Sequence, residues 1–332
     1  MIISRTPFRI SFFGGGSDYP SYYREYGGSV LNTSINKYCY VTCRYLPPFF
    51  DHKYRIRYTK REETQTINEI QHPSVRACLN HLNFSEGIEV LHTSDIPAMS
   101  GIGSSSSFTV GLLKTLYALK GSMLTKRELC MEAIKIEQDV LQEHVGSQDQ
   151  TVAAFGGFNR IDFSGDRKIL VSPITINSKR IENLKSHLML FFTGFSRISS
   201  HIAKEQIEKT SNIIKEISRL KSMVDEAVTI LNCNTEPLNS FGQLLHESWL
   251  LKKSLTTKIS TPEVDNIYET ARHVGAIGGK LCGAGGGGFM LLFVPPEKQP
   301  RVREVLKNLV NVPFDFEDLG SQIVYNTAIS KD

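Results

Sequence analysis

Residues 97–107 combine glycines and serines in a segment that is able to bind phosphate. They run Pro-Ala-Met-Ser-Gly-Ile-Gly-Ser-Ser-Ser-Ser and lead straight into a helical pattern. Glycine lets the backbone approach a ligand closely, and the N–H groups at a helix N-terminus converge at the positive end of the helix dipole. The segment therefore predicts a cradle for phosphate groups. The residues of this cradle are Pro97, Ser100, Gly101, Ile102, Gly103, Ser104, Ser105, Ser106 and Ser107.

The order of residues in this segment excludes two common nucleotide-binding motifs. No lysine follows the glycines as it does in a G-x-x-x-x-G-K loop, and the segment does not fit the dinucleotide-binding fingerprint. The serine hydroxyls add hydrogen-bond donors, and one of them could bind Mg²⁺, a hard cation that takes few protein oxygens. The alternative for this segment is a flexible loop that ends in a serine helix cap.

A charged residue, Arg9, stands inside the apolar run of residues 8–13. An unpaired charge in a buried strand is costly, so we expect Arg9 to pair with a carboxylate or with a ligand. Asp18 follows the turn at residues 14–16, which are all glycine, and could accept hydrogen bonds from sugar hydroxyls. The alternative is a structural ion pair between Arg9 and Asp18, with Asp18 in an Asx turn.

A third glycine-rich segment, residues 280–289, precedes an apolar run and reads Lys-Leu-Cys-Gly-Ala-Gly-Gly-Gly-Gly-Phe. Two interpretations are open for it. It could be a loop whose backbone closes on a phosphate or a substrate, or it could be a tight hairpin or bulge.

Apolar periodicity predicts both strands and helices around these three segments. Strands are expected over residues 2–3, 8–13, 38–45, 89–92, 168–171, 188–192 and 289–294. Helices are expected over residues 108–121, 125–146, 213–231, 241–251 and 261–271. Thr125 opens a capping box, and Thr261 caps a helix that begins with proline. The polar residues 60–71 predict a surface loop, and a soft boundary divides the chain into domains 1–165 and 166–332.

Composition narrows the class of protein further. Hydrophobic residues make up 40% and charged residues 22% of 332 residues, which is ordinary globular usage in a chain long enough for a large core. The net charge of +4 is too small to indicate nucleic acid as a partner, although it suits a small anionic ligand. The six cysteines form no C-x-x-C pair, and no apolar run approaches the roughly 18 residues of a membrane helix. We therefore expect a cytoplasmic protein with reduced thiols and no membrane partner.

The three glycine-rich segments, in this order, resemble the motifs of the GHMP small-molecule kinases. The matching stretches are Pro7–Tyr19, residues 97–107 and residues 280–289, so the resemblance spans nearly the whole chain. Residues 145–150, Val-Gly-Ser-Gln-Asp-Gln, also look like the segment that supplies a catalytic aspartate in this family. The resemblance implies an α+β fold of two domains, the first like the second domain of a small-subunit ribosomal protein and the second ferredoxin-like. It also implies ATP and Mg²⁺ as cofactors.

Two glycines place the resemblance within a branch of this family. Galactokinases carry a Glu-His pair, which contacts galactose, where this chain has Gly15 and Gly16. The first segment looks instead like that of the heptose and fucose kinase branch. For a free-standing chain, this branch implies transfer of the γ-phosphate of ATP to the anomeric C1 hydroxyl of D-glycero-D-manno-heptose 7-phosphate, a step toward nucleotide-activated heptose for surface polysaccharide. The alternatives are a fucose-type 1-kinase acting on an unphosphorylated sugar, and a non-catalytic sensor of sugar and ATP.

The resemblance also implies roles for individual residues. Asp149 would accept the proton of the sugar hydroxyl, and Arg9 would orient it and stabilise transition-state charge. Ser105, or a neighbouring serine, and Glu137 would hold Mg²⁺. The residues expected to bind the substrate are Gly14, Gly15, Gly16, Ser17, Asp18, Tyr19, Arg197, Gly285, Gly286 and Gly287.

Three features stay open in the sequence. A phosphosugar needs a cationic group remote from C1, and the candidates by composition are Arg197, Arg160, Lys37 and Arg44. The adenine pocket is expected near residues 54–66. The chain could be a monomer or a homodimer.

Overall fold

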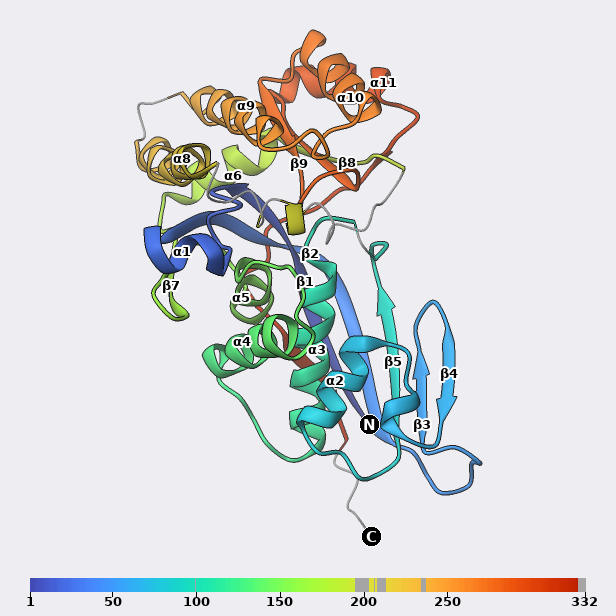
Figure 1. Ribbon diagram of the computed structural model, residues 1–332. Helices are drawn as coiled ribbons and strands as arrows, with labels where there is room; N and C mark the ends of the chain where they lie inside the picture. The colour runs from blue at the N-terminus through green and yellow to red at the C-terminus, as the bar shows by residue number, and fades with distance from the viewer. Residues whose placement is uncertain (99, 195–202, 206, 208–212, 234–236, 328–332) are drawn as a thin grey trace.

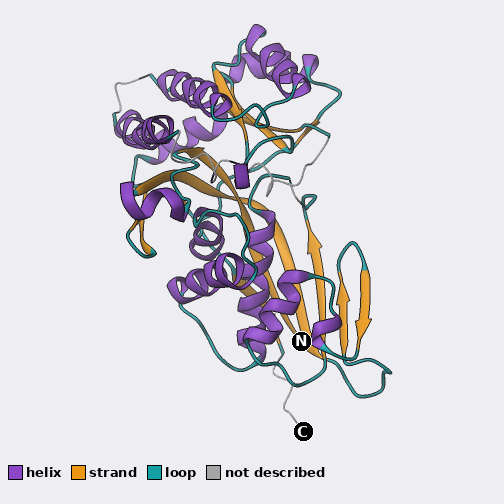
Figure 2. Cartoon of the chain, viewed as in Figure 1, coloured by secondary structure: helices purple, strands orange, loops and turns teal. Residues whose placement is uncertain are grey.

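Helices and strands alternate in groups along the chain and give it an α+β fold (Figures 1 and 2). The computed structural model describes residues 1–98, 100–194, 203–205, 207, 213–233 and 237–327. The strands are β1 (Ile2–Phe13), β2 (Gly28–Tyr45), β3 (Tyr54–Arg57), β4 (Arg61–Thr64), β5 (Ile88–Ser94), β6 (Phe158–Ser164), β7 (Lys168–Pro173), β8 (Leu188–Phe192), β9 (Gly278–Leu281), β10 (Phe289–Phe293), β11 (Val310–Asn311) and β12 (Gln322–Asn326). The helices are α1 (Pro20–Tyr26), α2 (Pro73–His81), α3 (Ser104–Leu119), α4 (Lys126–Ile134), α5 (Gln148–Phe155), α6 (Ser178–His187), α8 (Ile214–Asn232), α9 (Asn239–Ser254), α10 (Pro262–His273) and α11 (Gln299–Val305), with shorter turns η1 (Ile67–Glu69), η2 (Lys135–Val140) and η4 (Pro296–Lys298).

The larger sheet is built around the long antiparallel pair β1 and β2. Its main path runs β12-β1-β2-β5-β3-β4, while β6 pairs with β2 and β7 pairs with β6. Helix α3 packs directly on β1 and β2, and α4 and α5 lie against α3. Gly111 permits this close packing, because a Cβ there would lie 2.8 Å from the hydroxyl oxygen of Thr6. The helix that follows the glycine–serine segment is therefore fixed on the strand that carries Arg9.

The smaller sheet has the order β11-β8-β10-β9. All five residues of β10 are buried, which agrees with the uninterrupted apolar run that predicts a central strand. Helix α9 packs on β9 at a point where both backbones are glycine, because a Cβ on Gly278 would lie 1.9 Å from the carbonyl oxygen of Gly242. This contact brings the α9 side chains close to the third glycine-rich segment.

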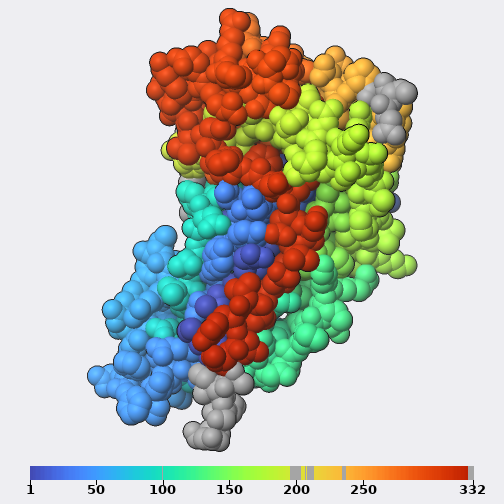
Figure 3. All heavy atoms as spheres, turned by 180° about the vertical axis from the view of Figure 1, so that it is seen from behind, coloured from blue at the N-terminus to red at the C-terminus, as the bar shows by residue number. Residues whose placement is uncertain are grey.

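The two sheets do not follow the expected division of the chain at residues 165 and 166. That boundary falls within the β6–β7 hairpin, whose two strands pair in the larger sheet. Near the C-terminus, β12 returns to pair antiparallel with β1 (Figure 3). The expected division places the residues of both β7 and β12 in the second domain. It differs from the structure because an apolar pattern does not identify the partner of a strand.

Two predicted local structures differ from the fold. Residues 60–71 form β4 and η1 rather than a loop. The residues of β4 are polar and do not by themselves predict a strand, but β4 pairs with β3, which contains Ile56. The helix expected over residues 125–146 has the predicted capping box at Thr125, but it changes into the π-helical turn η2 and ends at Val140. Such π-helical turns occur frequently at functional sites.

No helix in the described ranges is both long and apolar enough to cross a bilayer.

Two glycine-rich segments touch each other through their backbones. A Cβ on Gly101 would lie 2.6 Å from the carbonyl oxygen of Cys282, and one on Gly283 would lie 2.6 Å from the Cα of Gly101. A Cβ on Gly288 would lie 2.2 Å from the carbonyl oxygen of Ser100. The glycines of the third segment therefore let it seat against the second one.

This contact predicts that Gly101→Ala is much more damaging than Gly121→Ala. Both glycines have positive φ, +82° and +74°, but no atom lies within 4 Å of a Cβ on Gly121. We expect Gly121→Ala to cost about 1 kcal/mol through backbone strain alone, and Gly101→Ala to cost at least about twice that. Thermal unfolding of the two variants measures the difference, and equal losses of stability would contradict the proposed packing of the two segments.

Candidate active site

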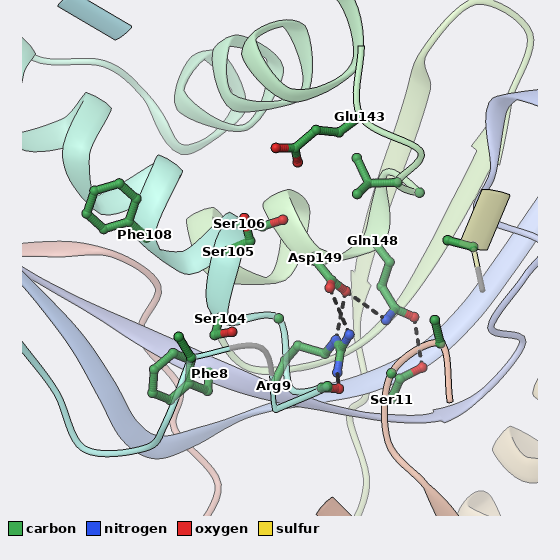
Figure 4. Close-up of a pocket in the computed structure, with 18 of the residues that line it drawn as sticks. Phe8, Arg9, Ser11, Ser104, Ser105, Ser106, Phe108, Glu143, Gln148 and Asp149 are labelled. Carbon is green, nitrogen blue, oxygen red and sulfur yellow. Dashed lines mark hydrogen bonds and ion pairs between the residues drawn. The ribbon is translucent and has the colours of Figure 1, made fainter. Parts of the chain in front are cut away.

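A cavity of about 920 Å³ lies where the glycine-rich segments come together. Its walls come from β1 and the turn after it, the end of β5, the start of α3, the start of α5, α9 and the third glycine-rich segment. This volume lies at the upper end of the range for small-molecule sites, so it can hold a nucleotide and a second ligand. Figure 4 shows the part of the cavity around Arg9 and Asp149.

The serines 104–107 form the first turn of α3 instead of the end of a loop. Gly103 precedes the helix in the left-handed conformation, and its carbonyl oxygen accepts the first helical hydrogen bond, from the N–H of Ser107. The earlier N–H groups of this turn have no intrahelical partner, as at any helix N-terminus. Because Ser104, Ser105 and Ser106 line the cavity, these N–H groups form a ready anion site there.

The guanidinium of Arg9 binds the carboxylate of Asp149 through two hydrogen bonds. Its Nε lies 2.7 Å from Oδ1 of Asp149, and its Nη2 lies 2.8 Å from Oδ2 (Figure 4). Its Nη1 donates to the carbonyl oxygen of Gly101 at 2.8 Å. Burial by itself lowers the pKa of Arg9, but the neighbouring Asp149 raises it above its ordinary value. The expected partner of the buried arginine is therefore Asp149, and the alternative pair with Asp18 does not form.

Gln148 holds Asp149 from the other side. Its side-chain amide donates to Oδ1 of Asp149 at 3.3 Å and accepts a hydrogen bond from the hydroxyl of Ser11 at 2.9 Å (Figure 4). Both residues open helix α5, which the sequence analysis did not predict. Two residues on β1 and one on α5 thus fix the carboxylate toward the cavity.

Asp18 is a second buried carboxylate near this pair. Its Oδ1 accepts a hydrogen bond from the N–H of Gly16 at 3.0 Å, and its Oδ2 accepts one from the N–H of Gln148 at 3.4 Å. Burial, followed by the charge of Asp149, raises the pKa of Asp18. Gly146 leaves the space for this carboxylate, because a Cβ there would lie 1.9 Å from Oδ2. Asp18 therefore lines the cavity with its carboxylate held by the N–H groups of Gly16 and Gln148, and not in the Asx turn given as an alternative.

Glu137 lies behind the serine turn and contacts Ser106 rather than Ser105. The hydroxyl of Ser106 donates to Oε2 of Glu137 at 2.8 Å, and the side-chain amide of Gln150 donates to the same oxygen. The other oxygen, Oε1, is buried and has no hydrogen-bond partner among the described residues. Burial, followed by the charge of Glu143, raises the pKa of Glu137 to about 7. Ser105 is exposed, so of the serines expected near the magnesium ion it is Ser106 that contacts Glu137.

One end of the cavity is aromatic. The ring of His72 lies 4.8 Å from that of Tyr58 and 4.9 Å from that of Phe108, while His92 lies 4.9 Å from Phe108 on the other side. Burial lowers the pKa of both histidines, that of His92 to about 4, so both rings are neutral at physiological pH. Tyr58 belongs to the region expected to hold adenine, whereas the two histidines and Phe108 were not predicted from sequence.

Two lysines that the sequence analysis did not select, Lys252 and Lys280, also line the cavity. Lys280 donates to the carbonyl oxygen of Phe12 at 3.0 Å, and Lys252 donates to the carbonyl oxygen of Gly283. Burial lowers the pKa of Lys252 to about 7 and that of Lys280 to about 8. Lys280 is the first residue of the third glycine-rich segment, so that motif could have indicated it from the sequence. Lys252 stands on an amphipathic helix, where a lysine ordinarily indicates a solvent-facing position.

Several predicted ligand-binding residues support the cavity without lining it. Ser17 is fully buried and donates to the carbonyl oxygens of Gly14 and Ser29, and Ser107 donates to that of Pro7. Ile102 is a core residue. Gly285 packs on the backbone of Ile259, and Gly286 and Gly287 are buried beside it. The predicted residues that do line the cavity are Arg9, Gly15, Gly16, Asp18, Tyr19, Pro97, Gly101, Gly103, Ser104, Ser105, Ser106 and Asp149, whereas the members of the third segment that line it are Lys280, Gly283 and Ala284.

The cations proposed from composition do not reach this cavity in the described structure. Arg160 pairs with Asp162 and Asp225, and Arg44 pairs with Glu89. Lys37 lies on β2 outside the cavity lining. Arg197 lies outside the described residues.

Comparison with known proteins agrees with this arrangement. The family model for the GHMP kinases N terminal domain matches residues 69–157, and that for the GHMP kinases C terminal region matches residues 229–311. The D-glycero-alpha-D-manno-heptose 7-phosphate kinase of Campylobacter jejuni subsp. jejuni is 30% identical over 330 residues, which cover 95% of this chain and 96% of that protein. The bifunctional fucokinase/GDP-fucose pyrophosphorylase of Arabidopsis thaliana is 25% identical over 97% of this chain, which spans only 32% of that longer protein.

Solved structures show the same fold. A structure described as a D-glycero-D-manno-heptose 1-phosphate kinase from Bacteriodes thetaiotaomicron superposes with a TM-score of 0.80 at 24% identity, covering 99% of this chain and 100% of that one. The galactokinase of Lactococcus lactis, complexed with galactose, gives a TM-score of 0.75 at 18% identity, covering 97% and 94%. The three glycine-rich segments, the extent of the family match and the shared fold lead to one conclusion: the chain belongs to the GHMP kinases and is a phosphotransferase.

Proposed function

We propose that this kinase transfers the γ-phosphate of ATP to the anomeric C1 hydroxyl of D-glycero-D-manno-heptose 7-phosphate, which gives the 1,7-bisphosphate. The observation that carries the proposal is the Arg9–Asp149 pair, held beside the anion-binding turn of α3 in one cavity. The 30% identity with a heptose 7-phosphate kinase, over nearly all of both chains, supports the choice of acceptor. Gly15 and Gly16 line the cavity and leave space beside Asp18 for a large sugar.

Phosphoryl transfer depends mainly on positioning and on neutralising phosphate charge. In our proposal the N–H groups of residues 104–106 and the hydroxyls of Ser104 and Ser105 bind the phosphates of ATP. Asp149 orients the acceptor hydroxyl and accepts its proton, since Arg9 and Gln148 hold the carboxylate in one orientation. Arg9 also places positive charge close to the phosphoryl group in transit. Asp18 accepts hydrogen bonds from other hydroxyls of the sugar.

The residues behind the serine turn fit a magnesium ion. Mg²⁺ in kinases is bound through one or two carboxylates together with substrate phosphates, so a cluster of acidic residues is not required. The buried and unpartnered Oε1 of Glu137 is a suitable carboxylate oxygen, and Ser106 supplies a hydroxyl beside it. When bound, the ion would neutralise phosphate charge during transfer. We therefore propose Glu137 and Ser106, the serine next to Ser105, as its protein ligands.

The aromatic end of the cavity suits the base of the nucleotide. Tyr58, His72 and Phe108 line the cavity and pack against one another as uncharged rings. Flat aromatic surfaces bind a purine ring by stacking. This assignment leaves the lysine end of the cavity for the acceptor.

The proposed acceptor predicts strong selectivity for a phosphorylated sugar. A site built to bind a charged group discriminates sharply against a ligand that lacks it, so we expect kcat/KM for heptose 7-phosphate to exceed that for free heptose by at least about 100-fold. ADP release with Mg·ATP and each sugar in turn, including fucose, mannose and galactose, measures this ratio. Faster turnover of fucose or another free sugar would replace the proposal by a fucose-type 1-kinase. If no ADP is released with any of these sugars, the result would favour a non-catalytic sensor.

The magnesium ligands predict different effects for two adjacent serines. Ser106→Ala removes the hydroxyl that contacts Glu137, so we expect it to raise the free Mg²⁺ needed for half-maximal rate by about tenfold. Ser105→Ala is the matched control on the exposed neighbour, and we expect less than a twofold change. Initial rates measured against free Mg²⁺ at constant total ATP separate the two. The reverse order of effects would return the metal site to Ser105.

A further inference from the structure

Lys252 and Lys280 line one cavity, and neither has an acidic partner among the described residues. Lys280 is 4% exposed, and Lys252 is partly buried on α9. Neither ammonium forms an ion pair with a carboxylate in the part of the chain that the structure describes, and both hold only backbone carbonyl oxygens. Buried charges are ordinarily paired, so this arrangement indicates that a counter-charge comes from outside the protein.

The hydrogen bonds already made leave donors for that counter-charge. An ammonium group has three N–H donors. Lys280 uses one on the carbonyl oxygen of Phe12, and Lys252 uses two on those of Leu281 and Gly283. Three donors therefore remain between the two lysines within the described contacts. Phosphate has several acceptor oxygens and binds both lysine ammonium groups and backbone N–H groups.

The electrostatics of the two lysines agree with an anion site. Burial is the main cause of the lowered pKa of both groups, and the charge of Lys280 lowers the pKa of Lys252 further. Arg9 acts on both in the same direction, whereas Cys282 and Asp18 oppose it. A bound dianion would relieve the repulsion among these cations. Perturbed groups that line a cavity are candidates for ligand binding.

The two lysines contact backbone segments other than the turn that is expected to bind the phosphates of ATP. Those phosphates have the N-terminal turn of α3, with its own N–H groups and serines. Lys280 is attached to the carbonyl of Phe12, which lies three residues beyond Arg9 on β1, or about 10 Å along a strand. A seven-carbon sugar whose C1 hydroxyl lies at Asp149 would carry a phosphate on its last carbon away from the transfer centre, in this direction.

We propose that Lys252 and Lys280 bind the phosphate group that the acceptor sugar already carries and thereby select phosphosugars over free sugars. This inference rests on the proposed function, because it needs a phosphorylated acceptor. Lys252 and Lys280 then take the role of the cationic group remote from C1, for which the candidates by composition are Arg197, Arg160, Lys37 and Arg44. The lysines bind the substrate, but they take no part in proton transfer.

Kinetics of Lys252→Met and Lys280→Met test this proposal. Methionine is an unbranched side chain only one atom shorter than lysine, and it carries no charge. We expect each variant to raise KM for heptose 7-phosphate by about 10- to 100-fold, the effect of losing one charge-assisted hydrogen bond, and to change KM for ATP less than about twofold. Lys253→Met is the control on the same helix, because Lys253 pairs with Asp265 at 2.9 Å outside the cavity lining. It should leave both KM values unchanged.

A second measurement distinguishes lost binding from lost folding. Heptose 7-phosphate without ATP should raise the unfolding temperature of the wild type and of Lys253→Met, but not that of Lys252→Met. Lys252→Arg and Lys280→Arg should recover part of the affinity, because they restore the charge. If either methionine variant unfolds, the glutamine variant at the same position, which also removes the charge, carries the comparison instead.

The outcomes separate this inference from the proposed function. If the wild type phosphorylates free sugars only, the proposed function fails and the inference fails with it. If the wild type uses heptose 7-phosphate but both methionine variants keep its KM, the inference alone is wrong. A rise in KM for ATP instead would assign the lysines to the nucleotide phosphates.

Discussion

The guanidinium of Arg9 joins three parts of the chain that are far apart in sequence. Through one side chain, β1 is connected to the carbonyl of Gly101 before α3 and to Asp149 at the start of α5. The backbone N–H of Arg9 also donates to the carbonyl oxygen of Ile102. A buried arginine requires such partners, because a guanidinium without counter-charge is costly in a protein interior. The same bonds that satisfy this charge set the distance between the anion-binding turn and the carboxylate.

Glycine contacts bring the second sheet to this centre. The loop between β9 and β10 packs on the loop before α3 at positions where neither loop has room for a Cβ. The third segment connects the paired strands β9 and β10, and Lys280, Gly283 and Ala284 in it line the cavity, so closure of its backbone on a ligand stays a prediction. Because α9 packs on β9, the same contact delivers Lys252 to the cavity. The glycines that do not touch the ligand space are therefore as necessary for the site as those that do.

Much of the fold follows from local patterns in the sequence. The capping box at Thr125, the Thr261–Pro262 helix start and the apolar strand at residues 289–293 all form as their residues predict. The pairing of Arg9 with a carboxylate also follows, because an apolar strand cannot bury that charge alone. The partner of a strand is a long-range property, so β12 could not be placed beside β1 from its own residues.

The finer features of the site depend on geometry that spacing alone does not give. Which serine meets Glu137 is decided by where α3 begins, and this depends on the left-handed conformation of Gly103. Lys252 has no motif around it, and its burial results from the packing of α9 against a distant glycine-rich loop. Sequence therefore identified the family and the catalytic candidates, whereas the proposed anion site required the structure.

The central claim is that Asp149, held by Arg9, performs the proton transfer. Single-turnover kinetics of Asp149→Asn with Mg·ATP and heptose 7-phosphate test it most directly, beside measurements of ATP affinity and thermal stability. Our account predicts a loss of about 10²- to 10⁴-fold in the rate of phosphoryl transfer, with ATP affinity within about twofold of the wild type. A folded Asp149→Asn variant that transfers phosphate at half the wild-type rate or faster would contradict the account.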